Sequence, residues 1–142
     1  MIDYADLIGK AYRLHAEGPD AYDCSTVAAE ILRRGGFQYA DLSTHRISGQ
    51  PVGILGYLAD NATRFQRVGD FITDATEDGD LVLTADGCRI NEQGLFVMAD
   101  ARHRLFLTAV PKSGVIAVGQ TALRRLRPKV LGVYRLAQRS AT

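Results

Sequence analysis

A turn-rich segment runs directly into an apolar helix in the sequence Gly18-Pro19-Asp20-Ala21-Tyr22-Asp23-Cys24-Ser25-Thr26-Val27-Ala28-Ala29-Glu30-Ile31-Leu32-Arg33-Arg34-Gly35-Gly36. Apolar residues recur at helical spacing after Cys24, which predicts a helix from Ser25 to about Arg34. Gly35 and Gly36 supply its stop signal. The sequence therefore places Cys24 at the start of an amphipathic helix, directly behind a turn.

Three further helices are expected on either side of this segment. Asp3 and Asp6 open a first helix, whose apolar positions extend to Leu14. A loop over 41–51 precedes a helix from about Val52 to Ala62. A short helix is expected over 120–126, ended by Pro128.

The second half of the chain changes to short apolar runs bounded by turn residues, which is typical of strands. The expected strands cover residues 81–83, 95–98, 105–109, 114–118 and 130–136. Helices that precede hairpin-like strands predict an α+β domain, with the helices packed on an antiparallel sheet of about five strands.

The composition is that of one globular domain, expected over 1–137 with a frayed tail over 138–142. Of the 142 residues, 46% are hydrophobic and 23% charged, which excludes a disordered chain. No apolar run approaches the length of a membrane span, and residues 1–6 lack the pattern of a signal peptide, so we expect a chain made in a cytoplasm without membrane insertion. A formal net charge of +1 argues against a nucleic-acid partner.

Cys24 is the strongest candidate for a chemically reactive residue. A helix N-terminus favours an anion, so a thiolate there would be a better nucleophile than an ordinary cysteine. The alternative is a small buried apolar residue. Cys88 lies in a turn-like segment and has no evident role, although a bridge to Cys24 stays open. Two cysteines and three histidines without ligand spacing predict neither a metal site nor a cofactor.

Four segments together resemble the NlpC/P60 family of papain-like cysteine peptidases. They are Leu7-Ile8-Gly9-Lys10-Ala11-Tyr12, Gly18-Pro19-Asp20-Ala21-Tyr22-Asp23-Cys24-Ser25, Asp78-Gly79-Asp80-Leu81-Val82-Leu83 and Val130-Leu131-Gly132-Val133-Tyr134-Arg135-Leu136. The resemblance covers nearly the whole chain in the family's order. It implies a papain-like fold in which Cys24 heads the central helix as the nucleophile and Tyr12 lines the active cleft.

The chain departs from the family at the other catalytic positions. Glu92, in Glu92-Gln93-Gly94-Leu95-Phe96-Val97, stands where the resemblance implies the catalytic histidine. Thr108, in Phe106-Leu107-Thr108-Ala109, stands where the group that orients this histidine is implied. A carboxylate with a reference pKa of about 4.3 is a poor base for a thiol with a reference pKa of about 8.5. Thr26 also replaces a glycine of the family motif, so the usual mechanism is expected to be impaired.

None of the three histidines falls at the implied position. His103 lies in a polar turn and is expected to be solvated, and His15 is expected near the C-terminal end of the first helix, where a cation suits the dipole. His45 lies in the loop before the third helix and is the best candidate to supply a base from elsewhere.

Two charged clusters each have two interpretations. Asp78 and Asp80 around Gly79 suggest a cation loop or, more simply, a turn before a strand. The basic cluster Arg124, Arg125, Arg127 and Lys129 is a solvated face or a docking patch for an acidic partner surface or a glycan polymer.

Two functions follow. The first is a degenerate NlpC/P60-like domain in a phage tail tip or baseplate, located in the virion, with a structural or cell-wall-binding role. Its partners would be other tail proteins, with peptidoglycan as a further candidate. The alternative is an active peptidoglycan cysteine endopeptidase, in which Cys24 attacks a wall peptide and N–H groups near Ser25 stabilise the oxyanion.

Overall fold

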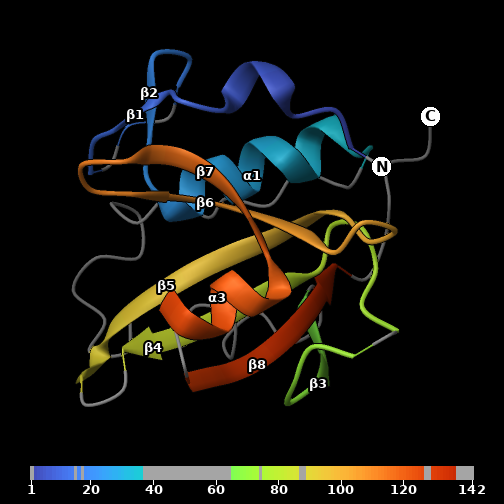
Figure 1. Ribbon diagram of the computed structural model, residues 1–142. Helices are drawn as coiled ribbons and strands as arrows, with labels where there is room; N and C mark the ends of the chain where they lie inside the picture. Colours follow the sequence, from blue (N-terminus) through green and yellow to red (C-terminus); the bar gives the residue numbers. More distant parts are fainter. Residues whose placement is uncertain are drawn as a thin grey trace.

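The computed structural model describes residues 2–14, 16, 18–36, 65–73, 75–86, 89–126 and 129–136, with only the backbone described for 86, 89–93 and 126. The chain folds as an α+β structure, as the order of elements in the sequence predicts (Figure 1). Its helical elements are the 3-10 turn η1 (Ala5–Leu7), α1 (Cys24–Arg34) and α3 (Gln120–Leu126). Its strands are β1 (Ala11–Tyr12), β2 (Ala21–Tyr22), β3 (Phe65–Gly69), β4 (Leu81–Asp86), β5 (Arg89–Asp100), β6 (Leu105–Val110), β7 (Gly114–Gly119) and β8 (Lys129–Leu136).

Six strands form one antiparallel sheet in the order β3-β8-β4-β5-β6-β7. The hairpins β4-β5, β5-β6 and β6-β7 join neighbours along the chain, and β8 inserts between β3 and β4. The sheet therefore has one strand more than the five or so that the sequence predicts, because the sequence does not predict β3. Strands β1 and β2 pair in parallel outside this sheet.

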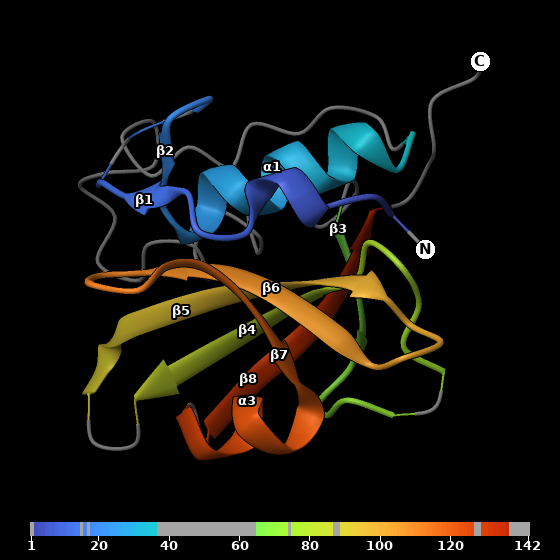
Figure 2. The same ribbon diagram turned by 45° about the horizontal axis from the view of Figure 1, so that its top comes forward.

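Helix α1 and helix α3 lie on opposite faces of the sheet (Figure 2). The α1 face is filled by aliphatic side chains such as Ile31, Leu95 and Leu107, all fully buried. The opposite face buries Phe96, Phe106 and, from α3, Leu123. Alternation along β5 explains the division, since successive residues of a strand point to opposite faces. The sheet is therefore covered on both sides, and α1 is held over β5 and β6.

The first predicted helix is wrong. Only Ala5–Leu7 forms a turn of 3-10 helix, after which Gly9 takes a φ of +87° and Ala11–Tyr12 forms β1. The Gly9 N–H donates to the Val115 carbonyl at 3.0 Å, and the Val115 N–H donates to the Lys10 carbonyl at 2.9 Å. Pairing with β7 therefore replaces the helix that the apolar spacing predicts. The helix expected over 52–62 and the tail over 138–142 lie outside the described residues.

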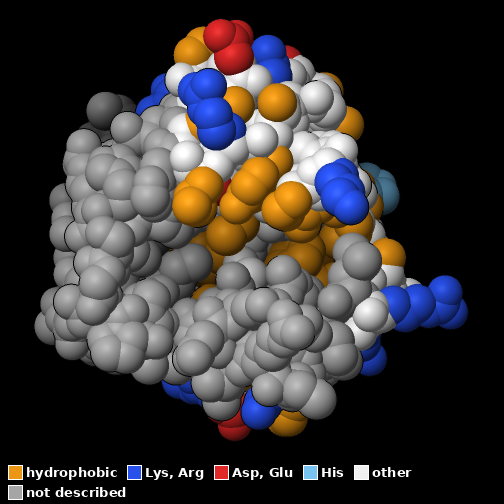
Figure 3. All heavy atoms as spheres, turned by 90° about the vertical axis from the view of Figure 1, so that its left-hand side faces the viewer, with side chains coloured by type: hydrophobic (Ala, Val, Ile, Leu, Met, Phe, Trp, Pro, Cys, Tyr) orange, Lys and Arg blue, Asp and Glu red, His pale blue; other side chains and the backbone are white. Residues whose placement is uncertain are grey.

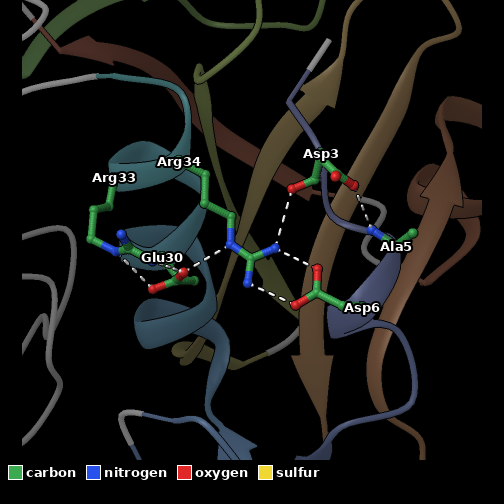
Figure 4. Close-up of polar contacts among 6 residues, drawn as sticks. All are labelled: Asp3, Ala5, Asp6, Glu30, Arg33 and Arg34. Atoms are coloured by element: carbon green, nitrogen blue, oxygen red, sulfur yellow. Dashed lines mark hydrogen bonds and ion pairs between the residues drawn. The ribbon is translucent and has the colours of Figure 1, made fainter.

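An ion-pair cluster joins the N-terminal segment to the end of α1 (Figure 4). The Arg34 guanidinium contacts both Asp6 oxygens, at 2.5 and 2.9 Å, and Glu30 at 2.8 Å. Arg33 also donates to Glu30, at 3.1 Å through Nε. Burial raises the pKa of Glu30, but the hydrogen bonds from Arg33 and Arg34 outweigh this effect and lower the pKa overall. The cluster ties η1 to the C-terminal turn of the helix that carries Cys24.

Candidate functional site

Helix α1 begins with a complete capping box around Cys24. The Asp23 carboxylate, 1% exposed, accepts the Ser25 N–H at 3.0 Å and the Thr26 N–H at 2.9 Å. It also accepts the Ser25 hydroxyl at 2.8 Å, while the Asp23 N–H donates to Thr26 Oγ1 at 2.9 Å. A carboxylate at this position satisfies helix N–H groups that have no intrahelical partner. The start of α1, and with it the place of Cys24, is thereby fixed.

Thr26 anchors the same end of the helix to the preceding segment. Its hydroxyl donates to the Ala16 carbonyl at 2.6 Å, and Thr26 is buried. A glycine at this position, which the sequence resemblance implies, could not make this hydrogen bond. The departure at Thr26 therefore has a local structural role.

The half-buried Cys24 side chain is a thiol that lines a pocket of about 90 Å³. Tyr12 borders this pocket from β1, Gly94 and Phe96 from β5, and Thr108 from β6. Ala109, Val110 and Pro111 complete the lining described by the structure. Figure 3 looks onto this end of the molecule, where hydrophobic side chains border a hollow. Three of the four predicted site positions, Cys24, Tyr12 and Thr108, thus share one pocket.

The Tyr12 phenol is electrostatically coupled to the start of α1. Partial burial raises the pKa of Tyr12, and the neighbouring Cys24 and Asp23 raise it further. A raised pKa keeps the phenol neutral at pH 7, because the ordinary value is already near about 10. Tyr12 therefore offers a hydroxyl next to the thiol and cannot act as its base.

The Thr108 hydroxyl forms a hydrogen bond within the sheet. Its side chain is 1% exposed, and its hydroxyl donates to the Leu95 carbonyl of the neighbouring strand at 2.8 Å. In a catalytic site the corresponding group accepts a hydrogen bond from an imidazole N–H and so orients the ring. The Thr108 hydroxyl uses its proton within the sheet but keeps oxygen lone pairs, so this bond gives Thr108 a structural role without deciding its part in catalysis.

Glu92 lies in β5, two residues before Gly94, which borders the pocket. Its side chain lies outside the described part of the structure. The backbone therefore brings this predicted position to the strand that lines the pocket, and the proposed role of its carboxylate stays a prediction.

Among the described residues that line the pocket, none is a histidine, a carboxylate or a lysine. His103 lies in the turn between β5 and β6, five residues from Thr108, or roughly 15 Å along an extended strand. Its ring, 64% exposed, contacts the Asp100 carboxylate through Nδ1 at 2.7 Å. The expectation of an exposed His103 is correct, and Asp100 is a partner that the sequence did not suggest. His15, His45 and Cys88 lie outside the described residues.

Three of the backbone N–H groups expected near Ser25 as oxyanion donors are already engaged. The Ser25 and Thr26 N–H groups both donate to Asp23, and the Val27 N–H donates to the Asp23 carbonyl at 3.1 Å. The buried carboxylate also compensates the positive end of α1, which would otherwise stabilise a thiolate. The capping that positions Cys24 thus reduces the two effects on which its activation would depend.

The segment around Gly79 is a turn, the simpler of its two interpretations. Gly79 has a φ of +87°, Asp78 accepts the Ala101 N–H at 2.6 Å, and Asp80 forms an ion pair with Arg135 at 2.8 Å. Within the described ranges, no group of three or more potential ligand side chains could hold a metal ion.

This chain matches no model of a known protein family, and no curated protein sequence is significantly similar to it. Within the part of the chain that the structure describes, no helix is long and apolar enough to cross a membrane.

Proposed function

We propose that this chain is an NlpC/P60-like domain of papain-like fold with a degenerate peptidase site. In this proposal it serves as a structural or cell-wall-binding part of a phage tail tip or baseplate. The family and the phage setting rest on the sequence resemblance alone. The loss of catalysis rests on one observation: the described lining of the pocket at Cys24 offers no histidine, carboxylate or lysine as a base for the thiol.

The papain-like part of this proposal is supported by the placement of Cys24. The residue is the first of α1, and α1 packs across β5 and β6 of the antiparallel sheet. The two positions implied for the base and its orienting group fall on those same two strands. Such a layout suits a nucleophile on a helix that faces a base on a sheet.

The degenerate state is supported by the chemistry of the lining. A thiol needs a base of matched pKa within hydrogen-bond reach, and the base needs a partner to orient it. The described lining supplies a neutral phenol and a threonine that donates its proton elsewhere. The capping of α1 by Asp23 removes two N–H donors as well.

An active peptidoglycan endopeptidase is the second candidate. It is favoured by the half-buried Cys24 thiol that borders an open pocket beside Tyr12. In this case Glu92, or His45 from outside the described residues, would have to take the proton.

Alkylation of Cys24 by iodoacetamide, followed by peptide mass spectrometry between about pH 5 and about pH 9, separates the two candidates. A degenerate site predicts a rate that rises with pH as for an ordinary thiol. Rapid alkylation that persists below about pH 7 would show an activated thiolate and would contradict the proposal. Cys24→Ala identifies the signal, and Glu92→His tests the alignment, because a histidine in register should increase the rate.

A further inference from the structure

The charges of this chain are divided along the sequence. All sixteen Asp and Glu residues fall within 1–100. Residues 101–142 contain nine Lys and Arg and no acidic residue. The net charge of +1 therefore hides a strongly basic C-terminal part, and such asymmetry is typical of an interaction with a polyanion.

The fold collects several of these cations around α3. Arg124 and Arg125 are exposed on α3, and Lys129 is exposed at the start of β8. Arg104 reaches the same helix, because its guanidinium donates to Gln120 Oε1 at 3.2 Å. Gln120 and Arg124 are four residues apart and so lie on one side of the helix. We call Arg104, Arg124, Arg125 and Lys129 the α3 surface.

The described cations of the chain differ in their partners. Arg34, Arg67 and Arg135 each form an ion pair with an aspartate. Within the described ranges Arg124, Arg125 and Lys129 form no ion pair, and the same is true of Arg13 and Arg102. The nearest acidic residue before them in the chain, Asp100, is buried and bound to His103. Among the described residues, no acidic side chain therefore neutralises Arg124, Arg125 or Lys129.

Helix stability accounts for only part of this arrangement. Cations in the last turn of a helix interact favourably with its dipole, which favours both Arg124 and Arg125. Lys129 lies beyond the helix, at the start of β8, where this effect does not explain it. Only Leu123 of the described α3 side chains is buried, so the remaining positions are open to a partner.

We propose that the α3 surface binds a linear polymer of polyol phosphates, the anionic polymer class of bacterial cell walls. Guanidinium groups match phosphate oxygens in bidentate geometry, and a flexible phosphodiester chain can contact cations that are spaced irregularly. The described residues of α3 and the first residues of β8 expose no aromatic ring on which a nucleic-acid base could stack. This disfavours binding of single-stranded nucleic acid. A wall polymer also agrees with the proposed function, on which this choice rests.

Binding is measured with poly(glycerol phosphate) as the probe, by titration calorimetry of the full chain at several salt concentrations. Three phosphate contacts predict that the association constant falls roughly 20-fold between about 50 and about 200 mM salt. Arg124→Gln with Arg125→Gln removes two of these contacts and should weaken binding roughly 20-fold near about 100 mM salt. The matched control is Arg13→Gln with Lys112→Gln, which removes two exposed cations from the pocket end of the molecule.

The inference holds if the α3 variant loses affinity, the control keeps it and both unfold at the wild-type urea midpoint. It is overturned if the wild-type chain does not bind, or if the control loses as much affinity as the α3 variant. Tighter binding of an oligonucleotide of equal charge would also overturn it, in favour of nucleic acid. Cys24 alkylation distinguishes the two proposals: a slow rate without polymer binding refutes only this inference, and a fast rate with intact polymer binding refutes only the loss of catalysis.

Discussion

Replacing Asp23 by alanine should be among the most damaging single changes to the Cys24 site. Its carboxylate accepts hydrogen bonds from the Ser25 N–H, the Thr26 N–H and the Ser25 hydroxyl, and all three residues are buried. Loss of an N-cap alone costs about 1 to 2 kcal/mol. Buried donors left without an acceptor cost about 1 to 3 kcal/mol more. We therefore expect Asp23→Ala to lower the free energy of unfolding by about 3 kcal/mol.

Asp23→Asn is the matched control. Its side-chain oxygen can still accept from the helix N–H groups, and asparagine is as good an N-cap as aspartate, so the loss should stay under about 1 kcal/mol. Urea unfolding followed by circular dichroism measures both variants, with the slope checked for two-state behaviour. A loss below about 1 kcal/mol for Asp23→Ala, or equal losses for the two variants, would refute the argument that this cap holds the start of α1.

Three other predictions concern the frame around the site. Arg34→Met should lower the urea midpoint at pH 7. The fold lowers the pKa of both Glu30 and Asp6, so the stability that their ion pairs with Arg34 contribute is present above the unfolded pKa values of these carboxyl groups. The difference in urea midpoint between Arg34→Met and wild type should therefore vanish as the pH falls towards about 3. An unchanged difference across this pH range would contradict the role given to the ion pairs. Gly114→Ala should lower the free energy of unfolding by roughly 2 kcal/mol or more in the same assay, because Gly114 has a φ of +73° and an added Cβ would lie against the Lys10 carbonyl. The control Gly119→Ala, with open space at its Cβ position, should lower it by less than half as much. Thr108→Val removes the hydroxyl that donates to the Leu95 carbonyl and should cost about 1 kcal/mol while Cys24 alkylation stays at the wild-type rate; a changed rate would assign Thr108 a part in the chemistry.

The elements that the sequence predicts correctly are those whose local pattern and tertiary environment agree. Helix α1 has an aspartate before it, an apolar stripe along it and glycines after it, and the structure begins it one residue earlier than expected. Helix α3 has the expected bounds. The five expected strands are all present, and β5 extends further towards its N-terminus through polar residues that resemble a turn.

The errors occur where distant contacts override the local pattern. Apolar spacing around Leu7 favours a helix, but pairing of Gly9 and Lys10 with Val115 draws the chain into an extended path. Strand β3 exposes three consecutive residues, Gln66, Arg67 and Val68, so it lacks the alternation by which a strand is recognised. Its place depends on pairing with β8, more than sixty residues away, which local sequence cannot reveal.

The candidate site was predictable in its members but only in part in their hydrogen bonds. The resemblance predicts Cys24, Tyr12 and Thr108 as site positions, and all three line one pocket. The contact between the Ser25 N–H and Asp23 is local and follows the N-cap pattern that an aspartate before a helix indicates. The bond from the Thr108 hydroxyl to the Leu95 carbonyl depends on the pairing of β5 with β6, which local sequence does not reveal.

Digestion of purified peptidoglycan tests the central claim most directly. The full chain and Cys24→Ala are incubated with the polymer between about pH 5 and about pH 9, and the released peptides are measured by liquid chromatography and mass spectrometry. A degenerate site predicts that the full chain releases no more peptide than Cys24→Ala at any pH. Release that depends on Cys24 would contradict the account and establish the chain as an active cysteine peptidase.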